Sequence, residues 1–324
     1  MRVLGVTLGD ERGIGPEVAF KALSRSRLTE RGAVVIIGGG SVIDEQARIH
    51  GWNSRIPVWS GRPQPERGLW KIDTTPEGVS PARASILALN RGANLAMKGE
   101  IDGLVTGPVN KASILREGIQ FTGQTEWLTG LAGDPNTGMM LLGTDRQERW
   151  LRVLLATTHI PLKEVPRTLS PQGIMRSIVL ASRACQELGL KTQRIAVCGL
   201  NPHAGEEGQL GDEEQAIIGP AIQEAQKMGI AVSGPWPADT VFRDAIQERH
   251  DVVVAMYHDQ GLAPLKLVAF ETGVNWTVGL PYPRTSPDHG TAFDIAGKGM
   301  ADPSSMEKAL ELAWILAGRK SPKG

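Results

Sequence analysis

Three apolar segments that each lead into a histidine are the feature that most constrains how this chain can fold. The segments and their histidines are residues 151–156 with His159, residues 195–198 with His203, and residues 252–256 with His258. Continuous apolar runs of this kind are typical of strands buried on both faces of a parallel sheet. In open parallel sheets, ligands bind just beyond the carboxyl ends of the strands. The sequence therefore predicts a sheet that brings three imidazoles to its ligand-binding edge.

Three imidazoles at one edge favour a metal site over three unrelated loop residues. A single histidine there more often makes ordinary hydrogen bonds. Three histidines that each follow a strand at the same edge suit a catalytic metal, which keeps coordination positions open for water or substrate. The ligands do not select among Zn, Mn, Co and Mg, although imidazole disfavours Mg. Two other histidines, His50 and His250, are expected at a helix end and at the amino end of a strand, away from this edge.

The stretch from residue 252 to residue 302 concentrates groups that bind metals, acids or phosphate. A helix-like segment carries Lys266, a strand carries Asn275, and a loop carries Arg284. Arginine and lysine suit carboxylate or phosphate ligands. We therefore expect the second half of the chain to supply much of a binding site.

Three further residues each allow two interpretations. Asp259 lies beside His258 and either orients that imidazole or caps a loop. Asp239, in the loop 234–240, is either a helix cap or a partner of a metal ligand. Thr125 opens a helix and either caps it or contributes to an anion site at the helix start. The residues alone leave these alternatives open.

Local signals predict several other elements. Ser80-Pro81 and Ser170-Pro171 are expected to open helices over residues 80–98 and 170–188, because proline suits the first helical position. Residues 54–79 are rich in proline and glycine and are expected to be irregular, with room for a short edge strand. The glycines of residues 9–17 do not form a GxGxxG dinucleotide fingerprint.

Length and composition bound the class of protein. The chain has 324 residues, more than one ordinary core holds, so two subdomains are expected. It has 35 basic and 35 acidic residues, which disfavours a nucleic-acid or membrane surface. Cys185 and Cys198 are predicted to be buried thiols in a reducing cytoplasm. Met1 leads directly into a predicted strand, so no signal peptide is expected, and no apolar run is long enough to span a membrane.

Seven motifs occur in order along nearly the whole chain. They are GDERGIGPE (9–17), LVTGPVNK (104–111), TTHIPL (157–162), CGLNPHAGE (198–206), GPWPADTVF (234–242), AMYHDQGLAPLKL (255–267) and RTSPDHGTAFDIAGKG (284–299). With these motifs the sequence resembles the PdxA family, the 4-hydroxythreonine-4-phosphate dehydrogenases. Joint agreement of seven ordered motifs makes the resemblance highly specific.

The resemblance implies an α/β fold of the isocitrate/isopropylmalate-dehydrogenase type, with two subdomains flanking a cleft. We place the first subdomain at residues 1–132 plus 281–324 and the second at residues 133–280. It also implies a homodimer whose active site is shared across the subunit interface. The family's divalent metal (Zn, Mg or Co) is held by three histidines, one from the partner subunit, and the matching positions are His159, His203 and His258.

The implied activity is an oxidation with NAD or NADP. The substrate would be 4-phosphooxy-L-threonine, decarboxylated to 3-amino-2-oxopropyl phosphate in pyridoxal phosphate biosynthesis. The family's substrate-binding positions match Thr125, Lys266, Asn275 and Arg284, and Lys266 and Asp239 are candidates for catalytic proton transfer. Alternatives are a related dehydrogenase of a phosphorylated four-carbon sugar acid or a cyclic diol acid, a metal-dependent hydrolase, and, by fold analogy alone, a phosphate acyltransferase.

This chain departs from the usual family pattern in two places. Gln124, a substrate-binding position, stands where the family usually has histidine. Glutamine makes hydrogen bonds but carries no proton or charge near neutrality. Glu11-Arg12 stands where the family usually has Pro-Ala. The first departure bears on which substrate is used.

Overall fold

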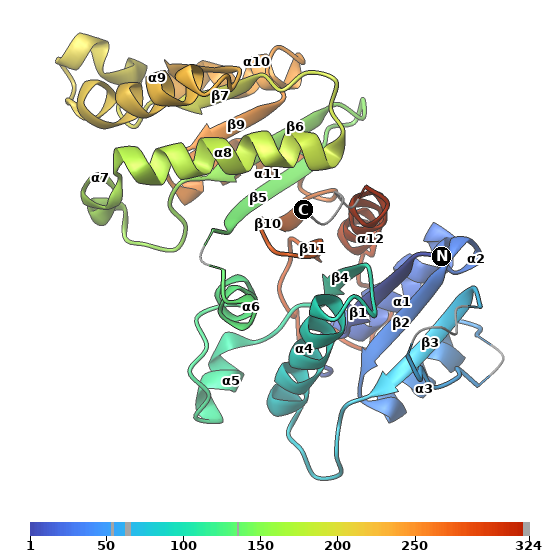
Figure 1. Ribbon diagram of the computed structural model, residues 1–324. Helices are drawn as coiled ribbons and strands as arrows, with labels where there is room; N and C mark the ends of the chain where they lie inside the picture. Colours follow the sequence, from blue (N-terminus) through green and yellow to red (C-terminus); the bar gives the residue numbers. More distant parts are fainter. Residues whose placement is uncertain (53–54, 62–65, 135, 320–324) are drawn as a thin grey trace. The chain divides into compact units, whose positions relative to one another are not determined.

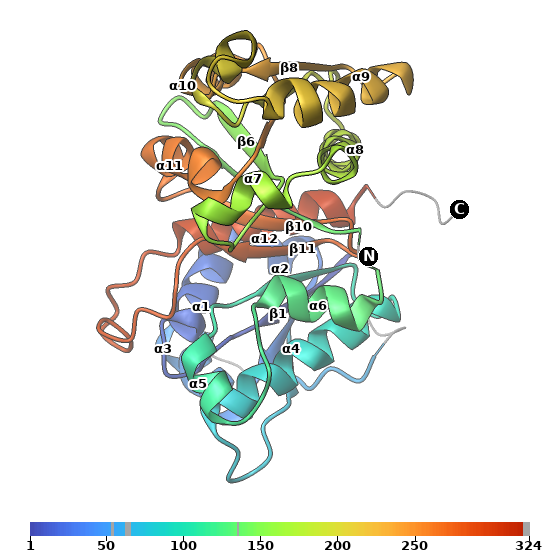
Figure 2. The ribbon, with the colours of Figure 1, turned by 90° about the vertical axis from the view of Figure 1, so that its left-hand side faces the viewer.

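The computed structural model describes residues 1–52, 55–61, 66–134 and 136–319, and the chain divides into two compact units (Figure 1, Figure 2). Of the described residues, 1–134 and 280–319 form the first unit and 136–279 form the second. Each unit combines part of a sheet with helices that cover it.

The strands of the first unit are parallel, in the order β3-β2-β1-β4-β11. Their bounds are β1 Val3–Thr7, β2 Ala33–Gly38, β3 Gly68–Asp73, β4 Gly103–Thr106 and β11 Arg284–Pro287. Every residue of β1 and β2 is buried, as expected for strands covered on both faces. β3 is the edge strand for which residues 54–79 left room; residues 54 and 62–65 of that stretch lie outside the described residues.

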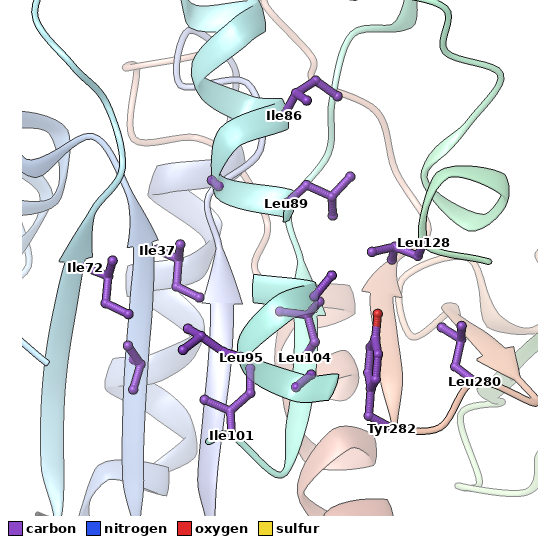
Figure 3. Packing of buried hydrophobic residues seen from close by; sticks show 14 of the residues in the cluster. Ile37, Ile72, Ile86, Leu89, Leu95, Ile101, Leu104, Leu128, Leu280 and Tyr282 are labelled. Atoms are coloured by element: carbon purple, nitrogen blue, oxygen red, sulfur yellow. The ribbon is translucent and has the colours of Figure 1, made fainter. Parts of the chain in front are cut away.

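Helices bury both faces of these strands. Their bounds are α1 Gly15–Ser26, α2 Leu28–Arg31, α3 Gly40–Ile49, α4 Pro81–Met97, α5 Lys111–Arg116, α6 Gln124–Ala132 and α12 Ser304–Ala317. Figure 3 shows Leu89 and Leu95 of α4 in the same cluster as Ile37 of β2. Val34 and Ile36 alternate along β2 with the residues of this cluster, so their side chains point to the opposite face of the sheet. Both are also fully buried. The unit is therefore a sheet between helical layers.

The second unit has a mixed sheet, in the order β10-β5-β6-β9-β7-β8. The bounds are β5 Gly138–Thr144, β6 Trp150–Leu155, β7 Ile195–Cys198, β8 Val232–Trp236, β9 Val252–Ala255 and β10 Val274–Val278. β10, β5 and β6 pair antiparallel, whereas β6, β9, β7 and β8 pair parallel. The three strands predicted from the histidine pattern are thus parallel neighbours, in the order β6-β9-β7, and that prediction is confirmed.

Helices also lie on both faces of the second sheet (Figure 2). Their bounds are α7 Val165–Thr168, α8 Pro171–Leu188, α9 Gly219–Lys227, α10 Ala238–Ile246 and α11 His258–Ala269, with 3-10 turns at Leu162–Glu164 and Pro202–Gly208 and a π turn at Glu214–Ile218. α10 and α11 cover the face that carries Val153, Ala196 and Val253. α8 packs on the other face, where Leu180 approaches Leu154 across Gly138.

The predicted helix starts are confirmed in α4 and α8. Ser80 Oγ accepts a hydrogen bond from the Arg83 amide at 3.3 Å, and Ser170 Oγ accepts one from the Gly173 amide at 3.1 Å. A proline follows each serine, at a position where the helix needs no amide donor.

Cys185 in α8 and Cys198 in β7 are buried free thiols, as predicted. Burial raises the pKa of each thiol to about 12, so both stay protonated near neutral pH and are poor nucleophiles. None of the helices in the described ranges has the length and apolar character needed to cross a membrane.

Gly9, at the turn after β1, should tolerate no side chain. Its φ is +77°, and a Cβ there would lie 2.1 Å from the carbonyl oxygen of Pro108. Gly99 has a φ of +72° but nothing within 4 Å of its Cβ position, so it is a matched control. We expect Gly99→Ala to lower the free energy of unfolding by about 1 kcal/mol and Gly9→Ala by about 3 kcal/mol, because only Gly9 adds a clash to the left-handed backbone. Denaturant unfolding measures both, and equal losses would contradict the close approach.

Candidate active site

The three histidines follow neighbouring parallel strands of the second unit. His159 follows β6, His203 lies in the 3-10 turn after β7, and His258 is the first residue of α11, just after β9. Because β6, β9 and β7 run in the same direction, all three histidines come after the same edge of the sheet. The strand assignment behind the metal prediction is confirmed; the metal itself stays a prediction.

His159 and His258 lie close together. Their ring centres are 5.4 Å apart, and the ring planes are inclined by 45°. Two imidazoles that each place a nitrogen about 2.1 Å from one tetrahedral ion have ring centres about 5 Å apart. The pair therefore has the spacing of two ligands of one ion.

In His203 and in His258, the ring nitrogen Nδ1 is hydrogen-bonded to a carboxylate. Glu206 Oε1 lies 2.5 Å from His203 Nδ1, and Asp259 Oδ1 lies 2.7 Å from His258 Nδ1. The hydrogen bond with Glu206 raises the pKa of His203. A carboxylate that accepts from Nδ1–H leaves Nε2 as the nitrogen able to bind a metal, which is the usual arrangement at metal-bound histidines. Of the two interpretations of Asp259, the structure supports orientation of His258.

The turn that carries His203 has a left-handed backbone. From His203 to Glu207 the φ angles are 50°, 54°, 83°, 43° and 58°. Each non-glycine residue in this region costs about 1 kcal/mol, so other contacts must hold the turn. Buried Glu214 is one of them, because its Oε1 accepts from the amides of Leu200 and Asn201, both at 2.7 Å. Strained backbone that is held in this way is typical of functional sites.

The structure brings together two of the three predicted metal ligands. The rings of His159 and His258 are in contact with each other. This ring contact does not include His203. Across the described ranges, no group of three or more His, Cys, Asp or Glu side chains is arranged to hold a metal ion. The assignment of all three histidines to one ion therefore stays a prediction.

Arg284 is a buried cation in the first unit. Its exposed fraction is 2%. The sequence predicted a loop here, but Arg284 is the first residue of β11, so that prediction is wrong. Nη2 donates to Thr106 Oγ1 at 2.6 Å, and Nη1 donates to Thr125 Oγ1 at 3.4 Å. Burial lowers the pKa of the guanidinium to about 10, so its surroundings disfavour the charge. A bound phosphate or carboxylate would compensate for that cost.

Gln124 and Thr125 are the first residues of α6 in the first unit. The helix cap is Gly123, so capping by Thr125 is the wrong interpretation, and its hydroxyl binds Arg284 instead. Gln124 Nε2 donates to the Gly107 carbonyl at 3.0 Å. Its Oε1 is buried and has no hydrogen-bond partner among the described residues. The amide is therefore anchored at one end and unsatisfied at the other.

The remaining candidates lie in the second unit. Lys266 is in the last turn of α11, and Asn275 is in β10 with its Oδ1 buried and without a partner among the described residues. Asp239 lies in the first turn of α10, whose cap is Pro237, so the cap interpretation is wrong here too. The charge of Asp239 contributes to the raised pKa of His203.

The predicted site residues divide between the two units. The first unit holds Gln124, Thr125 and Arg284, and the second holds His159, His203, Asp239, His258, Lys266 and Asn275.

The two histidines expected to lie off the edge do so. His50 ends α3 and stacks on Phe20 with ring centres 6.3 Å apart. His250 precedes β9 at its amino end, with its ring 5.8 Å from that of Trp236.

Comparison with known proteins gives a consistent family assignment. The family described as Pyridoxal phosphate biosynthetic protein PdxA matches residues 34–313. A relative from Acidithiobacillus ferrooxidans (strain ATCC 53993), named 4-hydroxythreonine-4-phosphate dehydrogenase, is 42% identical over 98% of this chain and 97% of its own. The chain belongs to the PdxA family. A relative from Cupriavidus necator, named D-threonate 4-phosphate dehydrogenase, is 39% identical over 98% of both chains.

Solved structures confirm the predicted fold class. A crystal structure of 4-hydroxythreonine-4-phosphate dehydrogenase from Klebsiella pneumoniae has a TM-score of 0.82 and 38% identity, covering 98% of this chain and 100% of that one. Isocitrate dehydrogenase from Methylococcus capsulatus has a TM-score of 0.55 at 13% identity, covering 98% and 86%, which shows a shared fold alone.

Contacts in the first unit account for Glu11 and Arg12, where the chain departs from the usual PdxA pattern. The Glu11 carboxylate accepts from the amide of Gly39 at the turn into α3, and burial raises its pKa. Arg12 Nε and Nη2 donate to the two oxygens of Asp10 at 3.0 Å and 2.8 Å. Nη2 also donates to Ser113 Oγ at 3.2 Å. The substituted pair therefore ties the loop after β1 to its neighbours.

Thr106 and Glu206 contact predicted site residues, but their own roles are not among those predicted from the sequence. Thr106 ends the apolar strand β4, and nothing in that pattern indicates a hydroxyl bonded to Arg284. Glu206 had a usable signal, because a carboxylate three residues after a histidine can reach it within one helical turn.

Arg284 should support binding at the expense of stability. Its lowered pKa means that folding disfavours its charged form, which is present at every pH below about 10. We expect Arg284→Met to abolish substrate binding with little change in the free energy of unfolding of the ligand-free protein, because removal of the buried charge offsets the lost hydrogen bonds with Thr106 and Thr125. Arg284→Lys keeps the charge, loses the fork, and should weaken substrate binding by about 1.5–3 kcal/mol. Thermal unfolding and substrate titration check both; a large loss of stability in Arg284→Met would contradict this account.

Proposed function

We propose that this chain oxidises 4-hydroxythreonine 4-phosphate with NAD or NADP and decarboxylates the product to 3-amino-2-oxopropyl phosphate, in pyridoxal phosphate biosynthesis. The observation that carries the proposal is the presence in one chain of three histidines at a parallel strand edge and a buried arginine held by hydroxyls. Imidazoles suit a divalent metal, and the arginine suits phosphate or carboxylate. The name of the Acidithiobacillus relative supports the same substrate.

His159, His203 and His258 are the residues that would hold the metal, with Zn, Mg or Co as candidates. When bound, such an ion polarises the substrate hydroxyl and stabilises negative charge that develops on oxygen. The chain's own contribution is to fix the imidazoles, which Glu206 and Asp259 do through Nδ1.

Charged and neutral groups would divide the recognition of the substrate. Arg284 and Lys266 supply positive charge for phosphate and carboxylate, whereas Asn275 and Thr125 supply neutral hydrogen bonds. Lys266 and Asp239 are the candidates for moving the hydroxyl proton. The influence of Asp239 on the pKa of His203 supports its nearness to the metal ligands.

We also propose a homodimer whose active site is shared between subunits, with one of the three histidines coming from the partner. α11, which begins with His258, carries Leu267, and Phe270 is the cap that follows the helix; their exposed fractions are 88% and 74%. Large apolar side chains exposed together at one helix end are typical of a protein interface. The buried free thiols suit a cytoplasmic location, and we expect neither a nucleic-acid nor a membrane partner.

A phosphorylated four-carbon sugar acid is the second candidate substrate, and Gln124 is the observation that favours it. PdxA members usually have an ionisable histidine at this substrate-binding position, and glutamine does not ionise. The Cupriavidus relative is named for D-threonate 4-phosphate, an acid of this class. A cyclic diol acid is a further alternative within the dehydrogenases.

Reduction of NAD or NADP by the purified protein tests the proposed reaction. We expect reduced nicotinamide to form with 4-hydroxythreonine 4-phosphate, to stop when a chelator is added, and to return with divalent metal. His203→Ala should abolish the reaction in a folded protein, whereas His250→Ala, off the strand edge, should retain it. Release of phosphate without reduced nicotinamide would contradict a dehydrogenase and favour a metal-dependent hydrolase.

Gln124→His separates the two candidate substrates. If 4-hydroxythreonine 4-phosphate is the substrate, we expect its kcat/KM to change by less than about tenfold, because glutamine replaces one hydrogen bond. The measurement compares both proteins on this compound, on a phosphorylated four-carbon sugar acid and on a cyclic diol acid. A wild-type protein that is inert on the first compound and active on another would reverse the assignment.

A further inference from the structure

Gln260 is a buried side chain that connects two of the histidine-bearing strands beyond their ends. Its exposed fraction is 9%. Nε2 donates to the carbonyl of Gly199 at 2.7 Å, and Oε1 accepts from the amide of Met256, also at 2.7 Å. Gly199 directly follows β7, and Met256 directly follows β9. One side-chain amide therefore bridges the two backbones just past the last ladder pair, Val197 with Val254.

Thr157 holds the same peptide segment from the β6 side. Its amide and its Oγ1 both donate to the carbonyl of Met256, at 3.2 Å and 2.7 Å. Met256 is thus bonded through its N–H to Gln260 and through its C=O to Thr157. The three strand ends are fastened together through this residue.

Each fastened backbone lies close to a predicted metal ligand in the sequence. Thr157 precedes His159, Gly199 precedes His203, and Met256 precedes His258. The carbonyl of Gly199 only accepts and the amide of Met256 only donates, so the bridge needs a side chain with one donor and one acceptor. Glutamine meets that need, whereas methionine and an ionised glutamate do not.

We propose that Gln260 is a positioning residue for the metal site, which fixes the backbones that lead into His203 and His258 before a metal binds. The inference rests on the proposed function, because it requires these histidines to be metal ligands. Ligands already held in place lose less freedom on binding, so the bridge raises the affinity of the site for metal. Gln260 touches neither metal nor substrate in this role.

Three variants separate positioning from general stability. Gln260→Met removes both hydrogen bonds at similar side-chain length, and Gln260→Glu keeps the acceptor but loses the donor. Ile178→Ala is the matched control, because Ile178 is fully buried in α8, a helix that carries none of the histidines. The dissociation constant for Zn²⁺ is measured by competition with a chelator, and Tm is measured on the metal-free proteins.

We expect Zn²⁺ to bind on the order of 10-fold more weakly to Gln260→Met, in the range seen when supporting partners of metal ligands are removed. Gln260→Glu should also bind more weakly, and excess metal should restore kcat in both. Ile178→Ala should have a lower Tm with unchanged Zn²⁺ affinity. Amide hydrogen exchange of Met256 should be faster in metal-free Gln260→Met than in the wild type.

Unchanged Zn²⁺ affinity in both Gln260 variants would overturn this inference and leave the proposed function standing. A loss of affinity in Ile178→Ala as large as in Gln260→Met would also overturn it, because stability alone would then explain the effect. A wild-type protein that binds no divalent metal would overturn the proposed function and this inference together.

Discussion

The parallel pairing of β9 with both β6 and β7 is the constraint on which the candidate active site depends. Val254 of β9 lies opposite Leu154 on one side and Val197 on the other, so the three strands end nearly level. The segments that carry the histidines therefore start from neighbouring points. A shift of one residue in either pairing would displace one strand end by about 3.3 Å along the strand direction relative to its neighbours. The pairing of the apolar strands creates the shared edge, and the histidines lie in the segments that follow it.

The sequence predicted this part of the fold because strands covered on both faces leave continuous apolar runs. The left-handed turn after β7 was not predictable, because five positive φ angles depend on contacts such as those of Glu214 with Leu200 and Asn201. Thr125 illustrates the same limit in the site. Local pattern left capping and anion binding open, and the partner that decides between them, Arg284, lies far away in the sequence. Chemistry that depends on long-range contacts leaves no local pattern.

Several polar groups of the candidate site are costly to the ligand-free protein. Arg284 is buried with a lowered pKa, and Asn275 Oδ1 is buried without a partner among the described residues. Buried polar atoms are nearly always hydrogen-bonded, so exceptions call for an explanation. A bound anion would compensate for the buried charge of Arg284, and a bound hydrogen-bond donor would satisfy Asn275 Oδ1. Such a trade of stability for function is expected of binding residues.

The same reasoning ranks the departures from the PdxA pattern. Glu11 and Arg12 find their partners within the fold, at Gly39 and at Asp10 with Ser113, so local structure is sufficient to explain them. Gln124 differs, because its Nε2 is anchored on Gly107 while its Oε1 stays buried and unpaired among the described residues. An anchored amide cannot turn to exchange donor for acceptor without losing the Gly107 bond. The group that completes it must therefore be a hydrogen-bond donor, and hydroxyl or ammonium groups of a substrate meet that requirement where a phosphate oxygen does not.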